Sequence, residues 1–196
     1  MKICHFLPSS NSTIFIPLLV LWLTGCTSVP QQVSPVTAFE LNRYMGTWYE
    51  IARLDHSFER GLSNISATYH LKRDGSVEVI NRGFDVDEKQ WSEAIGNAKM
   101  VKDIHTGHFK VSFFGPFYSS YVVFHLEPDY SAALVSGYSN DYFWILSRTP
   151  SLPKEKIDHY LQLAKQHGFA TDQLIYPSQI QNRKKVNQMA HLYSTR

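Results

Sequence analysis

The segment ISATYHLKRDGSVEVIN, residues 65–81, contains two runs of alternating side chains that are separated by a turn sequence. In the first run, apolar residues occupy every second position and polar residues lie between them; in the second run, Val77 and Val79 flank polar Glu78. Such alternation is typical of β-strands that bury one face. The turn sequence Arg73-Asp74-Gly75 suits a tight hairpin connection. The segment therefore predicts two antiparallel strands joined by a hairpin.

Similar segments recur on both sides of this hairpin, roughly every ten residues. They are rich in β-branched and aromatic residues, and turn signals such as Gly115-Pro116 and Ser139-Asn140-Asp141 separate them. We expect strands at residues 46–54, 65–72, 76–84, 91–101, 108–114, 120–127, 132–137 and 142–148. Consecutive hairpins of this number predict an all-β fold, an eight-stranded up-and-down antiparallel barrel that closes around space for one small ligand.

The hydrophobic period changes after Pro150. Apolar residues then follow the spacing i, i+3, i+4 and i+7, at Ile157, Tyr160, Leu161 and Ala164. This spacing predicts an amphipathic α-helix over residues 153–167, with Ser151 as its cap and Gly168 at its end. We expect this helix to pack outside the barrel. Residues 173–176 predict a last short strand.

The composition indicates one folded domain that buries many rings. The chain has 196 residues, of which 43% are hydrophobic and 14% aromatic, so a disordered or collagen-like protein is excluded. The net charge of +2 is too small for binding to a phosphate backbone. We therefore expect no nucleic acid partner.

The first residues have the features of an export signal. Lys2 precedes an apolar run at residues 14–23, which is shorter than the ~20 residues that cross a bilayer. The next residues, Leu23-Thr24-Gly25-Cys26, resemble the bacterial lipobox, whose cysteine is lipidated and becomes the first mature residue. We expect a signal peptide at residues 1–25, an acylated Cys26 that anchors the chain, and a polar tether that ends at residue 37. In such lipoproteins an Asp after the cysteine favours the inner membrane, so Thr27 implies the periplasmic face of the outer membrane.

Motifs at both ends of the expected barrel resemble those of a known family. Gly46-Thr47-Trp48-Tyr49 begins the first strand, Asn140-Asp141-Tyr142 begins the eighth, and Arg148 ends it. In this order they resemble the lipocalins, and the segments 111–118 and 144–150 resemble the bacterial lipocalins, outer-membrane lipoproteins of the apolipoprotein D-like branch. The resemblance covers about residues 39–176, within an expected domain at 38–177. It implies that Gly46, Trp48 and Arg148 close one end of the barrel, with a guanidinium on an indole face.

Strand alternation, aligned with the lipocalin pattern, sorts the side chains into lumen and exterior. The short side chains of Ala94, Gly96 and Ala98 predict free volume, and Glu50 is a candidate polar group. An apolar cavity with few polar groups suits an acyl chain with a polar head. The alternative is that the same residues fill a solid core. The sixth strand is apolar on both faces, so its inward face is not assigned. The expected cavity-lining residues are Ala67, Tyr69, Val79, Asn81, Ala98, Val111, Phe113 and Trp144.

The resemblance implies a carrier of fatty acids, lysophospholipids or similar ligands, acting in outer-membrane lipid transport, storage or repair. Two other classes stay open. Exposed aromatic residues such as Phe117-Tyr118 suit a protein-interaction module of the envelope, and His125 with Glu127 suits a hydrolase with a lumenal acid/base pair.

No catalytic motif is present, and we expect no catalytic residue, metal or cofactor. His105 and His108 have a spacing that a metal could use, but a turn is the preferred interpretation. The sequence leaves the choice between monomer and homodimer open. The basic tail, residues 178–196, is either solvated or binds anionic lipid heads.

Overall fold

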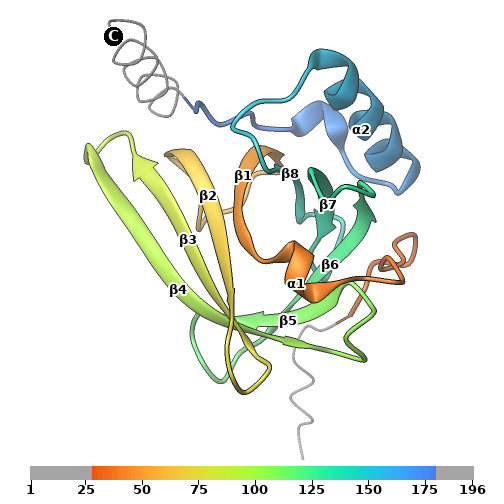
Figure 1. The fold of residues 1–196 in the computed structure, drawn as a ribbon. Coiled ribbons are helices and arrows are strands. Elements are labelled where there is room, and N and C mark those ends of the chain that lie inside the picture. The colour runs from red at the N-terminus through yellow and green to blue at the C-terminus, as the bar shows by residue number, and fades with distance from the viewer. Residues whose placement is uncertain (1–27, 180–196) are drawn as a thin grey trace, which may run out of the picture.

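The computed structural model describes residues 28–179, which form a closed antiparallel barrel with one long helix outside it (Figure 1). Each strand pairs with the next along the chain, and the eighth pairs with the first. The expected up-and-down barrel is thereby confirmed. The strands are β1 (Gly46–Arg53), β2 (Leu62–Leu71), β3 (Val77–Asp85), β4 (Gln90–Met100), β5 (His108–Ser112), β6 (Ser119–Leu126), β7 (Ala132–Ser136) and β8 (Phe143–Ser147).

The hairpin between β2 and β3 forms as its sequence predicts. Residues Ala67 and Asn81 are register partners. At the turn, the Lys72 amide donates to the Ser76 carbonyl at 2.8 Å, and Gly75 has a φ of 79°. Glycine suits this left-handed conformation because it has no Cβ. The Asp74 carboxylate accepts hydrogen bonds from the Ser76 amide and hydroxyl.

The long helix forms where the sequence predicts it, but its cap differs and a second, short helix is present. Helix α2 (Lys154–Gln166) lies outside the barrel and stops before Gly168, whose φ is 83°. Ser151 does not cap it, because the helix begins after Pro153 without a side-chain cap. A short helix α1 (Leu41–Tyr44) was not predicted. No helix within residues 28–179 is both long and apolar enough to cross a membrane.

The expected strand at residues 173–176 is wrong. A 3₁₀ helix, η1 (Thr171–Gln173), precedes a single β-bridge between Arg53 and Ile175, made by two backbone hydrogen bonds of 3.0 and 2.8 Å. The chain continues along β2, where the Asn64 amide donates to the Ser178 carbonyl at 2.7 Å. The rest of the basic tail, from residue 180, lies outside the described residues.

The protein has two hydrophobic cores, one inside the barrel and one between the barrel and α2. Strand β6 contributes to both, which explains why it is apolar on both faces. Tyr121 and Val123 point inward, whereas Val122 and Phe124 point toward α2. A register shift after Val123 then returns Leu126 to the inner face. A bulge of this kind adds one residue and breaks the two-residue period.

One end of the barrel is sealed by a tryptophan beneath an arginine. The Trp48 side chain is fully buried, and its indole N–H donates to the Tyr44 carbonyl at 2.8 Å. The Arg148 guanidinium lies 3.9 Å from the Trp48 ring centroid and donates to the carbonyls of Thr47 and Arg43 at 3.0 and 2.7 Å. Gly46 has a φ of 90°, and a Cβ there would lie 3.4 Å from the Arg148 side chain.

Residues 28–37 do not form the expected tether. Val33 is buried in the core beneath α2. The Val36 amide donates to the Val123 carbonyl, and the Val36 carbonyl accepts from the Gly107 amide, both at 2.9 Å. The segment therefore packs along the barrel instead of standing off as a spacer, because its valines are apolar enough to be buried.

We predict that Arg148→Ala lowers the free energy of unfolding by about 2–3 kcal/mol, since it removes a partly desolvated cation–π contact and two hydrogen bonds. Arg82→Ala is the matched control, because the Arg82 guanidinium lies 4.2 Å from the ring of exposed Trp91. The control should lose less than about 1 kcal/mol. Urea unfolding measures both, and equal losses would contradict the sealing role of Arg148.

Candidate functional site

The predicted lining residues are brought together on the inner face of the barrel. Ala67 is the register partner of Asn81, Tyr69 that of Val79, and Ala98 that of Val111. The apolar members all belong to the inner core or pack against it, including Phe113 and Trp144. The register therefore places these side chains on one continuous surface that faces the lumen.

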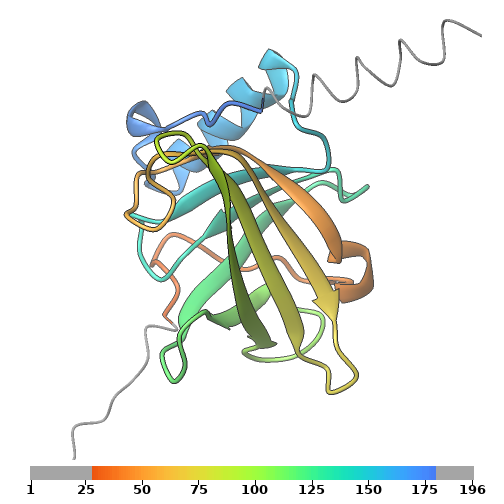
Figure 2. The same ribbon diagram turned by 90° about the vertical axis from the view of Figure 1, so that its left-hand side faces the viewer.

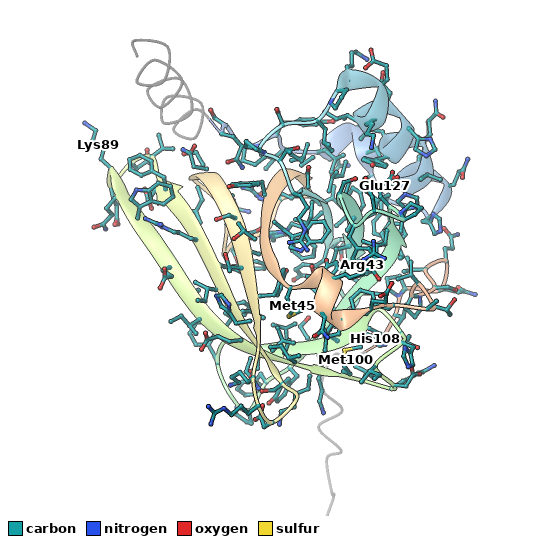
Figure 3. The ribbon with its side chains drawn as sticks, viewed as in Figure 1. Arg43, Met45, Lys89, Met100, His108 and Glu127 are labelled. Atoms are coloured by element: carbon teal, nitrogen blue, oxygen red, sulfur yellow. The ribbon has the colours of Figure 1, made fainter. Side chains whose placement is uncertain are left out.

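The half of the lumen next to Trp48 is filled by the protein's own rings. Three tyrosines meet there: the hydroxyls of Tyr44 and Tyr121 lie 2.7 Å apart, and the Tyr69 hydroxyl donates to that of Tyr121 at 2.9 Å. Burial raises the pKa of each hydroxyl. These rings leave a cavity of only about 10 Å³ beside Met45 and Ala98, which has room for about one water molecule. Figure 3 labels Met45, which directly follows α1.

The free volume that was expected around the short residues of β4 is smaller than their side chains suggest. A Cβ on Gly96 would lie 2.8 Å from the Phe113 ring, so this ring occupies the space beside the glycine. Ala98 is buried at the level of the tyrosines. Only Ala94, nearer the start of β4, is exposed. The Phe113 side chain, which directly follows β5, thus fills the space beside Gly96.

The other half of the lumen is open to solvent. Its inward-facing residues Ala67, Asn81, Phe113 and Trp144 are only half-buried, whereas Val79, one level deeper, is buried. Because these side chains face the inside of the barrel and are still partly exposed, water enters this part of the lumen. Figure 2 shows the barrel from the side, with α1 at the right and this open end at the left.

A buried ion pair lies on the wall of the open half. Glu50 and Arg53 are three residues apart on β1, and a regular strand would point them to opposite faces. A register shift between Glu50 and Ala52 places both on the inner face. The Arg53 Nη1 donates to Glu50 Oε1 at 2.8 Å, and each residue is only 2% exposed.

Glu59, from the loop that follows β1, extends this network to the aromatic residues at the mouth. The Arg53 Nη2 donates to the Glu59 carbonyl at 2.8 Å, and the Trp144 indole N–H donates to Glu59 Oε2 at 3.1 Å. The His56 Nε2 lies 3.3 Å from the same carboxylate oxygen. The His56 ring stacks on Phe58 with centroids 4.2 Å apart. Lumen-facing Trp144 is therefore held by a buried charge network.

The charges of this network are unequal, because one guanidinium faces two buried carboxyl groups. Burial raises the pKa of Glu50 to about 8, and Glu59 adds to this rise while Arg53 opposes it. Burial also raises the pKa of Glu59. The pKa of His56 is lowered to about 4 by burial and by the nearby Arg53 charge. The network therefore keeps a carboxyl proton near neutral pH and holds His56 uncharged.

Sequence reasoning identified Glu50 as a polar lining candidate but missed Arg53, His56 and Glu59. Regular alternation assigns Arg53 to the exterior, and only the bulge reverses this. His56 and Glu59 lie in a loop, where residue spacing does not define an inward face. The one available signal was an arginine three residues after Glu50 in the same strand.

The histidines that suggested metal or acid/base chemistry lie elsewhere. The His125 Nε2 is 3.8 Å from Glu127 Oε1, but this pair is outside the barrel, where the Tyr160 hydroxyl of α2 donates to Glu127 at 2.6 Å (Figure 3). The suggested acid/base pair is therefore not lumenal. His105 lies in the turn expected there, and buried His108 contacts Ser120. Across residues 28–179, no group of three or more metal-ligating side chains converges.

Known proteins of one family match this chain over most of its length. A family model described as a lipocalin-like domain matches residues 39–179. The chain is 50% identical over 167 residues to outer membrane lipoprotein Blc of Vibrio cholerae, covering 85% of this chain and 98% of the relative. It is 33% identical over 144 residues to apolipoprotein D of Macaca fascicularis, covering 69% and 72%. These relatives confirm the resemblance drawn from the motifs.

Among solved structures, insecticyanin from the tobacco hornworm Manduca sexta superposes with a TM-score of 0.62 at 21% sequence identity. The match covers 77% of this chain and 86% of insecticyanin. At this identity the likeness establishes a shared fold.

We predict that the parent protein loses stability at alkaline pH and that Glu50→Gln abolishes this loss. The pKa of Glu50 is raised in the folded protein. Its protonation therefore contributes fully to the free energy of unfolding below about pH 4.5, and this contribution is lost as pH rises through about 8. Between pH 6.5 and 8.5 the parent should lose about 2 kcal/mol more than the variant. Urea unfolding at the two pH values measures this difference.

The pH interval avoids His56, whose contribution has the opposite sign. Because the pKa of His56 is lowered, its stabilising contribution is lost only as pH falls from about 6.5 through about 4. Glu93→Gln, at an exposed position on β4, is the control and should retain the pH dependence of the parent. If Glu50→Gln behaves like this control, the assigned pKa is wrong.

Proposed function

The chain belongs to the lipocalin family, and we propose on this premise that it binds fatty acids, lysophospholipids or similar single-chain lipids in the open half of its barrel. The observation that supports this most is the inner face, which is apolar and accessible to solvent at Ala67, Phe113 and Trp144. The protein is an outer-membrane lipoprotein, as its relatives at 45–50% identity are named. We propose transport, storage or repair of membrane lipids as its role.

The driving force for binding is the removal of hydrocarbon from water. Each buried CH₂ group contributes roughly 0.8 kcal/mol, so a long chain binds even after the loss of its freedom of movement. Because the tyrosines fill the closed half, the acyl chain occupies the space between Ala67, Phe113 and Trp144 and does not reach Trp48. Its polar head lies toward the mouth, where half-buried Asn81 supplies a polar group.

Binding of this kind makes and breaks no covalent bond. The proposed carrier needs an apolar surface from which an acyl chain can displace water, and the inner face of the open half provides one. A hydrolase would need an activated group beside the acyl chain, but His125 and Glu127 face α2 on the exterior. The location of this pair favours carriage over hydrolysis.

The proposed anchor would keep the carrier close to its source of lipid. Acylation of Cys26, which lies outside the described residues, would place several acyl chains on one residue, and more than one chain holds a protein stably in a membrane. Confinement at the membrane raises the effective concentration of lipid at the barrel.

We predict that Ala94→Trp weakens the binding of a fluorescent fatty acid by about tenfold, because the indole would extend from β4 across the open lumen. Ile95→Trp is the matched control: it is the next residue, exposed on the outer face of the same strand. Its affinity should equal that of the parent. Titration of the fluorescent fatty acid measures each dissociation constant, and unchanged binding by Ala94→Trp would exclude this half of the lumen as the site.

We also predict that Cys26→Ser abolishes incorporation of labelled palmitate. The reason is that Cys26 is the lipobox cysteine. Thr27→Ser is the control and should be labelled like the parent. Undiminished palmitate labelling of Cys26→Ser would disprove the proposed anchor.

A further inference from the structure

The loop between β5 and β6, residues 113–118, is the most exposed apolar segment at the open end. Its sequence is Phe-Phe-Gly-Pro-Phe-Tyr and contains no charged residue. Phe114 is 81% exposed and Phe117 is 74% exposed. Exposing two neighbouring rings to water is unfavourable, and such patches mark surfaces that bind another molecule or a membrane. We call residues 113–118 the apolar loop.

Other exposed apolar residues lie at the same end of the barrel. The antiparallel order of the strands places the loops at residues 54–61, 86–89 and 137–142 around the open end, beside the apolar loop; all four lie at the left in Figure 2. Phe58 and Val86 are exposed on two of them. At the closed end, exposed Leu71 lies between His70 and Lys72, and exposed Ile104 lies between Asp103 and His105. The exposed apolar surface is therefore concentrated around the open end.

The N-terminal end of the described chain lies at this open end too. The Ser28 hydroxyl donates to the Tyr138 carbonyl, in the loop between β7 and β8, at 3.3 Å. Cys26 precedes Ser28 by two residues, which span at most about 7 Å. Because residues 28–37 pack along the barrel, they provide no additional slack. A lipid on Cys26 would therefore hold the open end close to the bilayer.

We propose that the open end of the barrel rests on the periplasmic leaflet of the outer membrane, with Phe114 and Phe117 inserted among the lipids. This inference rests on the proposed acylation of Cys26 and adds an orientation that the anchor alone does not define. In this orientation, a lipid passes between the leaflet and the lumen without crossing bulk water.

The charges at the open end restrict which part enters the membrane. The loops 54–61 and 86–89 carry the exposed acids Asp55, Asp87 and Glu88, which favour water or the headgroup layer. Lys89, at the tip of the β3–β4 hairpin, projects away from the barrel (Figure 3). The uncharged apolar loop is therefore the part that inserts, and the barrel tilts toward it.

The test uses the full mature lipoprotein with a single new thiol. Phe117→Cys reports on the apolar loop, and Ile104→Cys, at an apolar position of the closed end that is 60% exposed against 74% for Phe117, is the control. The chain has two cysteines, of which Cys4 lies in the expected signal peptide and Cys26 is the acylation site, so the new thiol alone is labelled. Each protein is labelled with the fluorophore NBD and reconstituted into vesicles of phosphatidylethanolamine and phosphatidylglycerol.

We expect the label at position 117 to brighten about fivefold in vesicles and to resist reduction by externally added dithionite, because it enters an apolar layer. The label at 104 should stay dim and react at once. Equal reaction at both positions, or protection at 104 alone, would overturn the inference. Vesicle flotation distinguishes failure of the orientation from failure of the anchor. If the labelled proteins float but react equally with dithionite, the anchor is present and the proposed orientation is wrong. If they do not float, the proposed anchor is wrong as well.

A second variant excludes protection by a ligand in the lumen. Phe114→Ser with Phe117→Ser keeps Cys26 and the lining residues, so it should float and bind fatty acid like the parent. Its transfer of a fluorescent fatty acid from vesicles should be about tenfold slower, since the apolar contact with the leaflet is lost. Ile104→Ser should transfer at the parental rate. Equal rates for all three proteins would show that the apolar loop does not act at the membrane.

Discussion

The packing of Arg148 on Trp48 is the contact on which the rest of the structure depends. A closed sheet of eight strands has two ends, and a lumen open at both would expose its apolar wall to water throughout. Here the indole, the guanidinium and helix α1 seal one end, and three tyrosines fill the space behind them. Because that half is solid, any ligand enters from the opposite end and lies in the remaining half.

The open half combines an apolar wall with a buried charge network, and the two are physically linked. The bulge in β1 points both Glu50 and Arg53 inward, and Glu59 connects Arg53 to the indole of Trp144. Burying these charges costs stability unless each has a partner, so the network holds the mouth loop in one position. The same network holds Trp144 at the wall where an acyl chain would lie. The stability of the fold and the shape of the proposed site thus depend on the same residues, Glu50, Arg53 and Glu59.

The packing of the N-terminal segment relates the fold to the membrane. A free tether would let the barrel sample all orientations, but residues 28–37 run along the barrel and begin beside the mouth. A lipid anchor at Cys26 and the exposed rings of the apolar loop would then act at the same end. An anchored carrier of this form would exchange lipid with the leaflet over a short path. Its proposed orientation would depend on the packing of residues 28–37 as well as on the anchor.

The sequence by itself determined the strands, their order, helix α2 and the residues that seal the barrel, because side-chain alternation and short motifs are local properties. It also indicated the lining residues, since a regular strand fixes the face of each one. Only the tertiary structure decided how much of the lumen is empty, because Phe113 and three tyrosines, brought together from distant parts of the chain, fill space that Gly96 and Ala98 leave. The bulges in β1 and β6 were likewise invisible in the pattern: an inserted residue reverses alternation, and only pairing with a neighbouring strand reveals it.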